Sequence, residues 1–132
     1  MESIKVFVYG TLREKGSNHR LIKPFLLDSR PYTVKGDLYD VCGAYPALVL
    51  DQEGGNVIGE LCTVQAEALE RLDRLEGYFS PGNPSNLYDR VLFEGDDGEI
   101  FFVYTWSRLK VNHRKLQRIE SGDWIGSSSL AF

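Results

Sequence analysis

Two short segments of this 132-residue chain carry residue types that could do chemistry. The first is the turn at residues 9–13 (YGTLR), which follows an apolar run and contains Gly10. A glycine directly after a buried strand lets the main chain approach a ligand closely or adopt a positive φ. Successive N–H groups in such a turn can bind an oxyanion or a carboxylate, although many strand-end glycines only turn the chain. The turn is therefore a candidate anion-binding site.

The second segment ends in Glu76, the last residue of the run with the clearest helical periodicity, residues 66–76. A carboxylate in the last helical turn faces the negative end of the helix dipole, which disfavours ionisation. Burial would raise its pKa in the same direction. A glutamate with a raised pKa suits proton transfer near neutral pH. The structural alternative is an ordinary solvated glutamate at a helix end.

The helix that would hold Glu76 is amphipathic. Leu69, Leu72 and Leu75 recur every three residues and form its apolar face together with Ala68. The residues predicted to face outward are Glu67, Glu70, Arg71, Asp73 and Arg74. Gly77 is placed to end the helix in a left-handed conformation.

The strand that would hold the turn is residues 4–9 (IKVFVY). Val6 and Val8 lie on one face of this strand and Phe7 and Tyr9 on the other, so both faces are apolar. Apolar side chains on both faces indicate a central strand of a sheet.

The remaining elements are predicted from propensity and turn signals. Ser17 and Asn18 could cap a short helix over residues 19–27, and Pro31 precedes a second strand at residues 33–39. Polar residues separate two further pairs of strands, each predicted to form a hairpin. These pairs are residues 47–50 with 57–64, and residues 88–94 with 99–106.

The C-terminal part is more polar. Residues 111–119 are compatible with a helix, and residues 126–132 lack core-forming side chains, so we expect a frayed polar tail. We therefore expect one domain at residues 1–125. About six strands with two or three helices in so short a chain predict an α+β fold with a curved or closed sheet.

Composition narrows the function classes. The net charge of −4 gives no electrostatic reason to expect nucleic acid or an anionic membrane as a partner. No apolar run is long enough to span a bilayer, and the first residues lack a signal-peptide pattern, so we expect a cytoplasmic protein. The two cysteines and two histidines are not spaced as a metal site.

Two separated motifs resemble the gamma-glutamylcyclotransferase-like family. Residues 6–13 (VFVYGTLR) look like the opening strand and turn of its members, and residues 72–78 (LDRLEGY) look like the segment that carries their catalytic glutamate. Supporting segments in the family's order are residues 44–49, 59–61, 87–90 and 103–106. The resemblance covers residues 4–125 and is closer to the AIG2-like, gamma-glutamylamine branch than to the glutathione-degrading branch.

The resemblance implies a small mixed β-barrel with a few outer helices and a cavity at one end. It also implies a reaction in which the free α-amine of a γ-glutamyl amide attacks the γ-carbonyl, releasing 5-oxoproline and an amine. Because nucleophile and electrophile belong to one molecule, holding the substrate in a ring-like conformation supplies much of the rate enhancement. The partner would be this small molecule, and the oligomeric state is left open.

Residue roles follow from the resemblance. Glu76 would be the catalytic acid and base. Main-chain groups of Tyr9, Gly10, Thr11 and Leu12 would hold the substrate's α-carboxylate and the developing oxyanion. Tyr88 and Tyr104 match pocket-lining positions of the family, and Tyr45 with the loop at residues 81–84 would shape the leaving-group side. The resemblance implies no metal and no cofactor.

Two other readings stay open at this point. The chain could be a non-catalytic binding module that kept the cavity, although a binding module has no need of a buried acid. It could also be a dedicated biosynthetic enzyme that removes a γ-glutamyl group from a natural product. The sequence does not separate the possible leaving amines, because loops build that side of the cavity.

Overall fold

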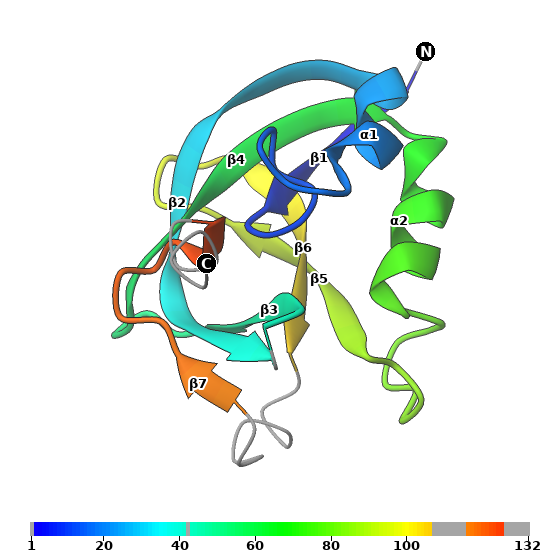
Figure 1. The fold of residues 1–132 in the computed structure, drawn as a ribbon. Coiled ribbons are helices and arrows are strands. Elements are labelled where there is room, and N and C mark those ends of the chain that lie inside the picture. Colours follow the sequence, from blue (N-terminus) through cyan, green and yellow to red (C-terminus); the bar gives the residue numbers. More distant parts are fainter. Residues whose placement is uncertain (1, 42, 107–115, 126–132) are drawn as a thin grey trace.

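The computed structural model describes residues 2–41, 43–106 and 116–125, and these form one sheet with short helices beside it (Figure 1). The strands are β1 (Ser3–Val8), β2 (Leu26–Val41), β3 (Tyr45–Leu50), β4 (Gly55–Gln65), β5 (Tyr88–Glu94), β6 (Ile100–Trp106) and β7 (Leu116–Arg118). The helices are α1 (His19–Ile22), a 3₁₀ turn (Lys23–Phe25) and α2 (Ala68–Glu76).

The sheet is mixed and curls into a half-barrel. Its strand order is β3-β2-β4-β1-β6-β5, and β7 pairs with β2. The pairing of β1 with β6 is parallel, and the other pairings within the described residues are antiparallel. The long strands β2 and β4 form the arc across the top and left of Figure 1, and α1 and α2 lie to its right. The predicted α+β class, with a curved mixed sheet and a few outer helices, is confirmed.

The central position predicted for the first strand is also confirmed. β1 lies between β4 and β6, and its side chains alternate between two apolar clusters. Val6 and Val8 belong to one cluster, whereas Phe7 and Tyr9 belong to the other. All four side chains are buried, so close packing fixes the position at which the chain leaves β1 and enters the turn.

β2 is much longer than predicted. It has 16 residues, where the sequence pattern indicated a strand at residues 33–39 only. Pro31 lies inside this strand, opposite Glu60 of β4, rather than in front of it. The β2–β3 pairing begins only at Gly36, so Pro31 sits in a stretch where β4 is its described partner. Proline is tolerated in a strand that is paired on one side only, because no second ladder there requires its missing N–H.

The predicted hairpin between residues 47–50 and 57–64 was wrong. Both strands exist, as β3 and β4, but β2 lies between them and pairs with each. β3 begins shortly after β2, with the N–H of Ala44 donating to the carbonyl of Val41 at 3.0 Å, and the loop after β3 crosses β2 to reach β4. Strand periodicity identifies a buried segment but does not say which neighbour it pairs with, so the long β2 could take the place of the expected partner.

α2 and its end agree with the prediction. The helix closes at Gly77, which has φ 66° and ψ 37°. The N–H of Tyr78 donates to the carbonyl of Asp73, which completes the capping motif. Ala68 and Leu72 are buried, whereas Leu75 is partly exposed at the edge of the pocket described below.

α1 is shorter than the predicted helix at residues 19–27. It ends at Ile22, and Leu26 already begins β2. Pro24 in the following 3₁₀ turn cannot donate an i→i−4 hydrogen bond, which accounts for the early end. Asn18 makes no capping hydrogen bond; its side-chain amide donates to the hydroxyl of Thr11 at 3.0 Å instead.

The second predicted hairpin is confirmed, because β5 and β6 pair along their whole length from Tyr88–Trp106 to Glu94–Ile100. The helix predicted at residues 111–119 was wrong for Leu116–Arg118, which form β7 against β2. Residues 111–115 of that prediction lie outside the described residues. So does the predicted polar tail at residues 126–132.

Candidate active site

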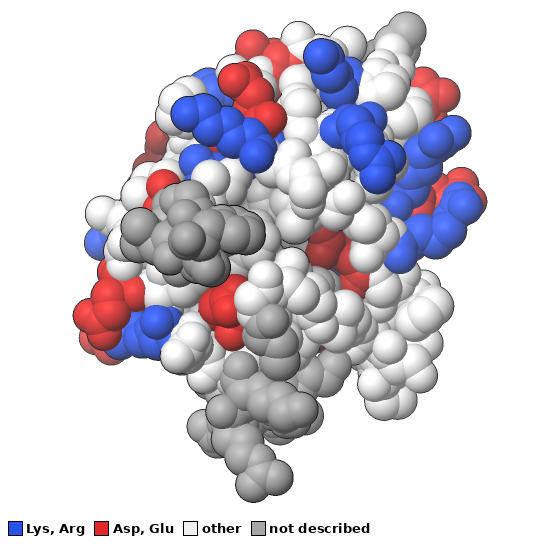
Figure 2. Space-filling model, in the orientation of Figure 1, with Lys and Arg blue, Asp and Glu red and all other residues white. Residues whose placement is uncertain are grey.

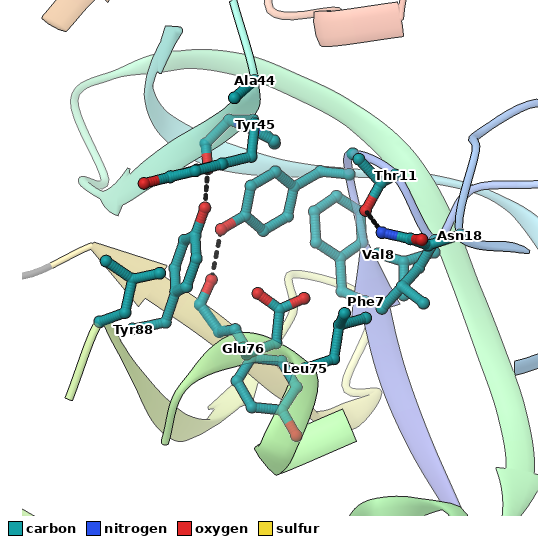
Figure 3. Close-up of a pocket in the computed structure, with 15 residues that line it drawn as sticks. Phe7, Val8, Thr11, Asn18, Ala44, Tyr45, Leu75, Glu76 and Tyr88 are labelled. Atoms are coloured by element: carbon teal, nitrogen blue, oxygen red, sulfur yellow. Dashed lines mark hydrogen bonds between the residues drawn. The ribbon is translucent and has the colours of Figure 1, made fainter. Parts of the chain in front are cut away.

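One pocket, with a volume of about 210 Å³, lies where the end of β1, the start of β3 and the end of α2 meet (Figure 3). All seven residues predicted to form the site line it: Tyr9, Gly10, Thr11, Leu12, Glu76, Tyr88 and Tyr104. The other lining residues are Phe7, Val8, Asn18, Ala44, Tyr45, Pro46, Leu75 and Leu87. Tyr45, which was expected on the leaving-group side, thus lines the pocket, whereas residues 81–84 do not.

The C-terminal end of α2 carries Glu76 to this place. The carbonyl of Gly77 accepts a hydrogen bond of 2.9 Å from the N–H of Leu87, one residue before β5. β5 pairs with β6, and β6 pairs with β1, so the helix end is tied to the strand that supplies the turn. Figure 3 shows the Glu76 carboxylate pointing into the cavity between Tyr88 and Val8.

Glu76 is in an unusual state for a carboxylate. Burial raises its pKa from 4.5 to about 7, because the charged form loses water contacts. Within the described residues, no hydrogen-bond donor and no cation pairs with this carboxylate. Desolvation alone accounts for the shift. Glu76 therefore exchanges a proton near neutral pH, which a general acid and base requires.

The turn after β1 supplies donors to the same pocket. The N–H groups of Gly10, Thr11 and Leu12 have no acceptor within the described residues. The turn itself is closed by the N–H of Arg13, which donates to the carbonyl of Gly10 at 3.1 Å. Main-chain N–H groups gathered in a turn form an anion-binding surface.

Gly10 does not adopt the positive φ that was one of the two expectations for it. Its φ does not lie in the left-handed region, since the positive-φ glycines of the described residues are at other positions. A Cβ added at Gly10 would lie 2.4 Å from Cγ and 2.7 Å from Cδ of Pro46. Glycine is required here because Pro46 at the start of β3 packs against the main chain of the turn.

Arg13, at the end of the turn, anchors it to two acidic side chains. Its Nε donates to Glu60 at 3.0 Å and its Nη1 donates to Asp123 at 2.8 Å. The other oxygen of Glu60 accepts a hydrogen bond of 2.8 Å from the N–H of Glu14. No local pattern in the sequence points to Glu60 or Asp123, because they lie 47 and 110 residues away from Arg13 along the chain.

Two tyrosines line the pocket, and the hydroxyl hydrogen of each is donated to a main-chain carbonyl. The hydroxyl of Tyr9 donates to the main-chain carbonyl of Tyr104, and that of Tyr88 donates to the carbonyl of Pro46 (Figure 3). Burial raises the pKa of both phenols far above the ordinary value, and the charge of Glu76 raises it further. Both side chains are therefore neutral and lie close to Glu76.

Tyr104 is anchored differently, through a residue that the sequence analysis placed on the outer face of the helix. Its hydroxyl donates to Asp73 at 2.7 Å, and the other oxygen of Asp73 accepts a hydrogen bond from Arg90. The Arg90 guanidinium lies over the rings of Tyr78 and Phe102, 4.8 and 5.1 Å from their centroids. The available signal was spacing: Asp73 precedes Glu76 by three residues, which puts both on one side of the helix.

The charge around the pocket is uneven. The lining residues include a single ionisable acid, Glu76, and no Lys or Arg. Figure 2 shows acidic atoms at the bottom of a hollow beside the end of α2, while basic side chains gather on the α1 and α2 side of the same face. An anion in the pocket would therefore depend on neutral donors, such as the main-chain N–H groups of the turn, because the lining holds no basic side chain.

Two further features bear on cofactors and location. No group of three or more His, Cys, Asp or Glu in the part of the chain that the structure describes could hold a metal ion. The helices within the same residues also lack the length and apolar character that a membrane span needs.

Comparison with known proteins gives a consistent result. The family model "Gamma-glutamyl cyclotransferase, AIG2-like" matches residues 6–126. The protein named gamma-L-glutamyl-butirosin B gamma-glutamyl cyclotransferase from Niallia circulans is 45% identical over 106 residues, which cover 78% of this chain and 67% of that protein.

Two solved structures resemble the fold. An AIG2-like protein from Mus musculus superposes with a TM-score of 0.60 at 26% identity, covering 91% of this chain and 88% of that one. YkqA from Bacillus subtilis superposes with a TM-score of 0.68 at 26% identity, covering 98% of this chain but 42% of YkqA.

Proposed function

The chain belongs to the gamma-glutamyl cyclotransferase, AIG2-like family, and on this premise we propose that its pocket cleaves a γ-glutamyl amide with Glu76 as acid and base. The substrate's own α-amine is the nucleophile. The products are 5-oxoproline and the free amine or amino acid that was bound at the γ-carbonyl.

The reaction balances with one protein carboxylate. The α-ammonium first gives a proton to Glu76, and the neutral nitrogen then attacks the γ-carbonyl carbon to form the five-membered ring. The carbonyl oxygen becomes an oxyanion in the tetrahedral intermediate. As the oxyanion collapses, Glu76 returns its proton to the leaving nitrogen, and the bond between this nitrogen and the γ-carbon breaks to release a neutral amine. The ring nitrogen still carries two hydrogens, and it gives one of them through the Glu76 carboxylate to the departing amine. 5-Oxoproline therefore leaves as a neutral lactam and the amine leaves as an ammonium. Glu76 ends in its starting state.

The turn after β1 supplies the second part of the mechanism. In this proposal the N–H groups of Gly10, Thr11 and Leu12 bind the substrate's α-carboxylate and stabilise the oxyanion as it develops. Tyr9, Tyr88 and Tyr104 line the same cavity and hold the glutamyl group. Donors that are fixed before the substrate binds cost no reorganisation when charge develops, which is why they favour the transition state.

The observation that carries the proposal is the state of Glu76. Within the described residues this carboxylate has no hydrogen-bond or ionic partner, and its pKa is about 7. Such a group lowers the stability of the fold, and groups of this kind are found mainly at functional sites. This observation favours catalysis over a non-catalytic binding module. A module that only binds γ-glutamyl compounds would gain from a neutral or paired residue at this position.

A panel of γ-glutamyl compounds, assayed for 5-oxoproline release, tests the proposal. The panel includes γ-glutamyl amino acids, γ-glutamylamines and γ-glutamyl conjugates of larger amines, each at matched concentration. We expect release from at least one class. Binding of panel members without release by the wild-type protein would favour the binding module instead.

A second candidate concerns the leaving group. The relative from Niallia circulans is named for γ-L-glutamyl-butirosin B, which supports a dedicated enzyme that removes a γ-glutamyl group from a natural product. The residues that border the pocket include Ala44 and Tyr45 at a turn and the half-buried Leu87, and in this candidate they would lie beside the leaving group. Release from a large conjugate but not from γ-glutamyl amino acids would favour this candidate. The cytoplasmic location stays a prediction.

A further inference from the structure

Tyr88 is held rigidly at the pocket wall. Only 4% of its surface is exposed, and its ring packs edge-on against Trp106 and Tyr45, with centroid distances of 5.3 and 6.2 Å. The hydroxyl donates to the main-chain carbonyl of Pro46, and the ring of Pro46 packs against Gly10. The ring and the hydroxyl hydrogen therefore have one orientation each, and the phenol oxygen cannot turn its hydrogen toward the pocket without losing this bond.

The hydroxyl hydrogen of Tyr9 is also used in a hydrogen bond to the main chain. Its hydroxyl donates to the carbonyl of Tyr104, and the main-chain N–H of Leu48 also points toward its oxygen. A hydroxyl has one hydrogen and two lone pairs, so both phenols can only accept hydrogen bonds from anything in the pocket. Burial and the charge of Glu76 raise the pKa of Tyr88, as expected for groups that lie close together.

The pocket thus has two chemically different sides. Tyr88, Tyr9 and the ionised Glu76 offer acceptors, while the turn at Gly10–Leu12 offers main-chain donors. Figure 3 shows Thr11 and Tyr88 on opposite sides of the cavity, with Glu76 between them. A primary ammonium has three donors and no acceptor, so it is complementary to the acceptor side. A carboxylate is complementary to the donor side.

We propose that the phenol oxygens of Tyr88 and Tyr9 accept hydrogen bonds from the substrate's α-amino group and make the pocket selective for a free primary amine. This inference rests on the proposed function and adds a specificity role to two wall residues. The two hydrogen bonds remain available after the ammonium has given one proton to Glu76, because the neutral amine keeps two hydrogens. The nitrogen lone pair then points away from the phenols, toward the γ-carbonyl.

Calorimetric binding of two ligands tests the inference without needing turnover. L-glutamine and glutaramic acid differ only in the α-amino group, so their affinity ratio measures recognition of the amine. We expect the wild-type protein to prefer L-glutamine. In Tyr88→Phe we expect the affinity for L-glutamine to fall by about tenfold or more, since the variant loses a hydrogen bond to a charged group. The affinity for glutaramic acid should not change.

A matched control removes a hydroxyl elsewhere. Tyr32→Phe deletes a hydroxyl that contacts Asp97 on the surface and is not part of the pocket, so both affinities should stay as in the wild type. A fall in both affinities for Tyr88→Phe would mean that the hydroxyl only holds Pro46 in place, and the inference would be wrong. Equal binding of the two ligands by the wild-type protein would overturn it even if Tyr88→Phe does not fold.

The inference and the proposed function can fail separately. A protein that prefers L-glutamine but releases no 5-oxoproline from any γ-glutamyl compound would retain the amine site without the reaction. A protein that releases 5-oxoproline but binds both ligands equally in wild-type and variant form would be an enzyme that orients its amine by other means.

Discussion

The hydroxyl of Tyr104 donates a hydrogen bond of 2.7 Å to Asp73, which joins the central part of the sheet to the helix that carries Glu76. Asp73 and Glu76 are one helical turn apart, so the position of one constrains the other. Arg90 pairs with the same carboxylate from β5. This three-residue contact fixes the depth at which the end of α2 enters the pocket.

Asp73→Asn should weaken that anchor. The amide can still accept from Tyr104, but the ion pair with Arg90 is lost and leaves a half-buried cation without its partner. We expect a loss of about 2 kcal/mol in the free energy of unfolding, measured by chemical denaturation, and a lower kcat. Glu70→Gln removes a charge from the exposed side of the same helix and serves as control. Equal effects of the two substitutions would contradict the anchoring role.

Glu76→Gln should abolish turnover but not folding. The amide is nearly the same size and stays neutral, so packing around it is kept, but it cannot accept the proton of the α-amine. We expect kcat to fall by about 10²–10⁴-fold, at the upper end because one group serves both proton transfers. 5-Oxoproline release and ligand binding are measured side by side. Wild-type turnover by this variant would show that Glu76 is an ordinary helix-end residue.

The pH dependence of activity should report the same group. The reaction begins with ionised Glu76, and its pKa is about 7 because of burial. Activity, measured as kcat/KM, should therefore fall as the pH drops through about 7, well above the pKa of an exposed glutamate. A profile that stays flat down to pH 5 would mean that another group acts as the base.

Glu76 should also affect stability with pH, in the direction opposite to most carboxylates. Its folded-state pKa is raised, so the folded protein binds the proton more tightly than the unfolded chain does. The free energy of unfolding should fall as pH rises from about 4.5 to about 7, by on the order of 3 kcal/mol for this group. Glu76→Gln lacks this contribution, so the stability difference between variant and wild type should change across that range and level off above it.

Gly10→Ala tests the contact between the turn and β3. The new Cβ would lie 2.4 Å from Cγ of Pro46, so Pro46 must move and take with it the carbonyl that binds Tyr88. We expect a loss of about 1–3 kcal/mol in stability together with weaker ligand binding. Gly55→Ala is the control, because nothing lies within 4 Å of a Cβ at that position. Unchanged thermal unfolding and binding in Gly10→Ala would show that Pro46 adapts without consequence.

Several elements could be predicted because the information for them is local. Apolar side chains on both faces of β1 predicted its central place, and the leucine spacing with Gly77 predicted α2 and its end. The hairpin of β5 and β6 followed from a polar turn between two apolar runs. In each case the neighbours along the chain determine the conformation, so the pattern is enough.

Partnerships across the sheet could not be predicted in this way. β2 extends over Pro31 and lies between β3 and β4, so these two strands do not form the hairpin expected from sequence order. Asp73 was predicted to face outward, and its partners Tyr104 and Arg90 are 31 and 17 residues away. Helical periodicity assigns a polar residue to the outer face of the helix, but it contains no information on whether another element covers that face.

The sequence by itself determined the residue types of the site: a glycine turn after a buried strand and a glutamate at a helix end. It also determined the family, through two motifs separated by about sixty residues. The tertiary structure decided that Glu76 is half-buried and desolvated without a partner among the described residues. It also decided that Pro46 packs against Gly10, and that Tyr9 and Tyr88 direct their hydrogens away from the pocket. Burial and hydrogen-bond direction depend on what the rest of the chain places around a group, so no local pattern of residues contains them.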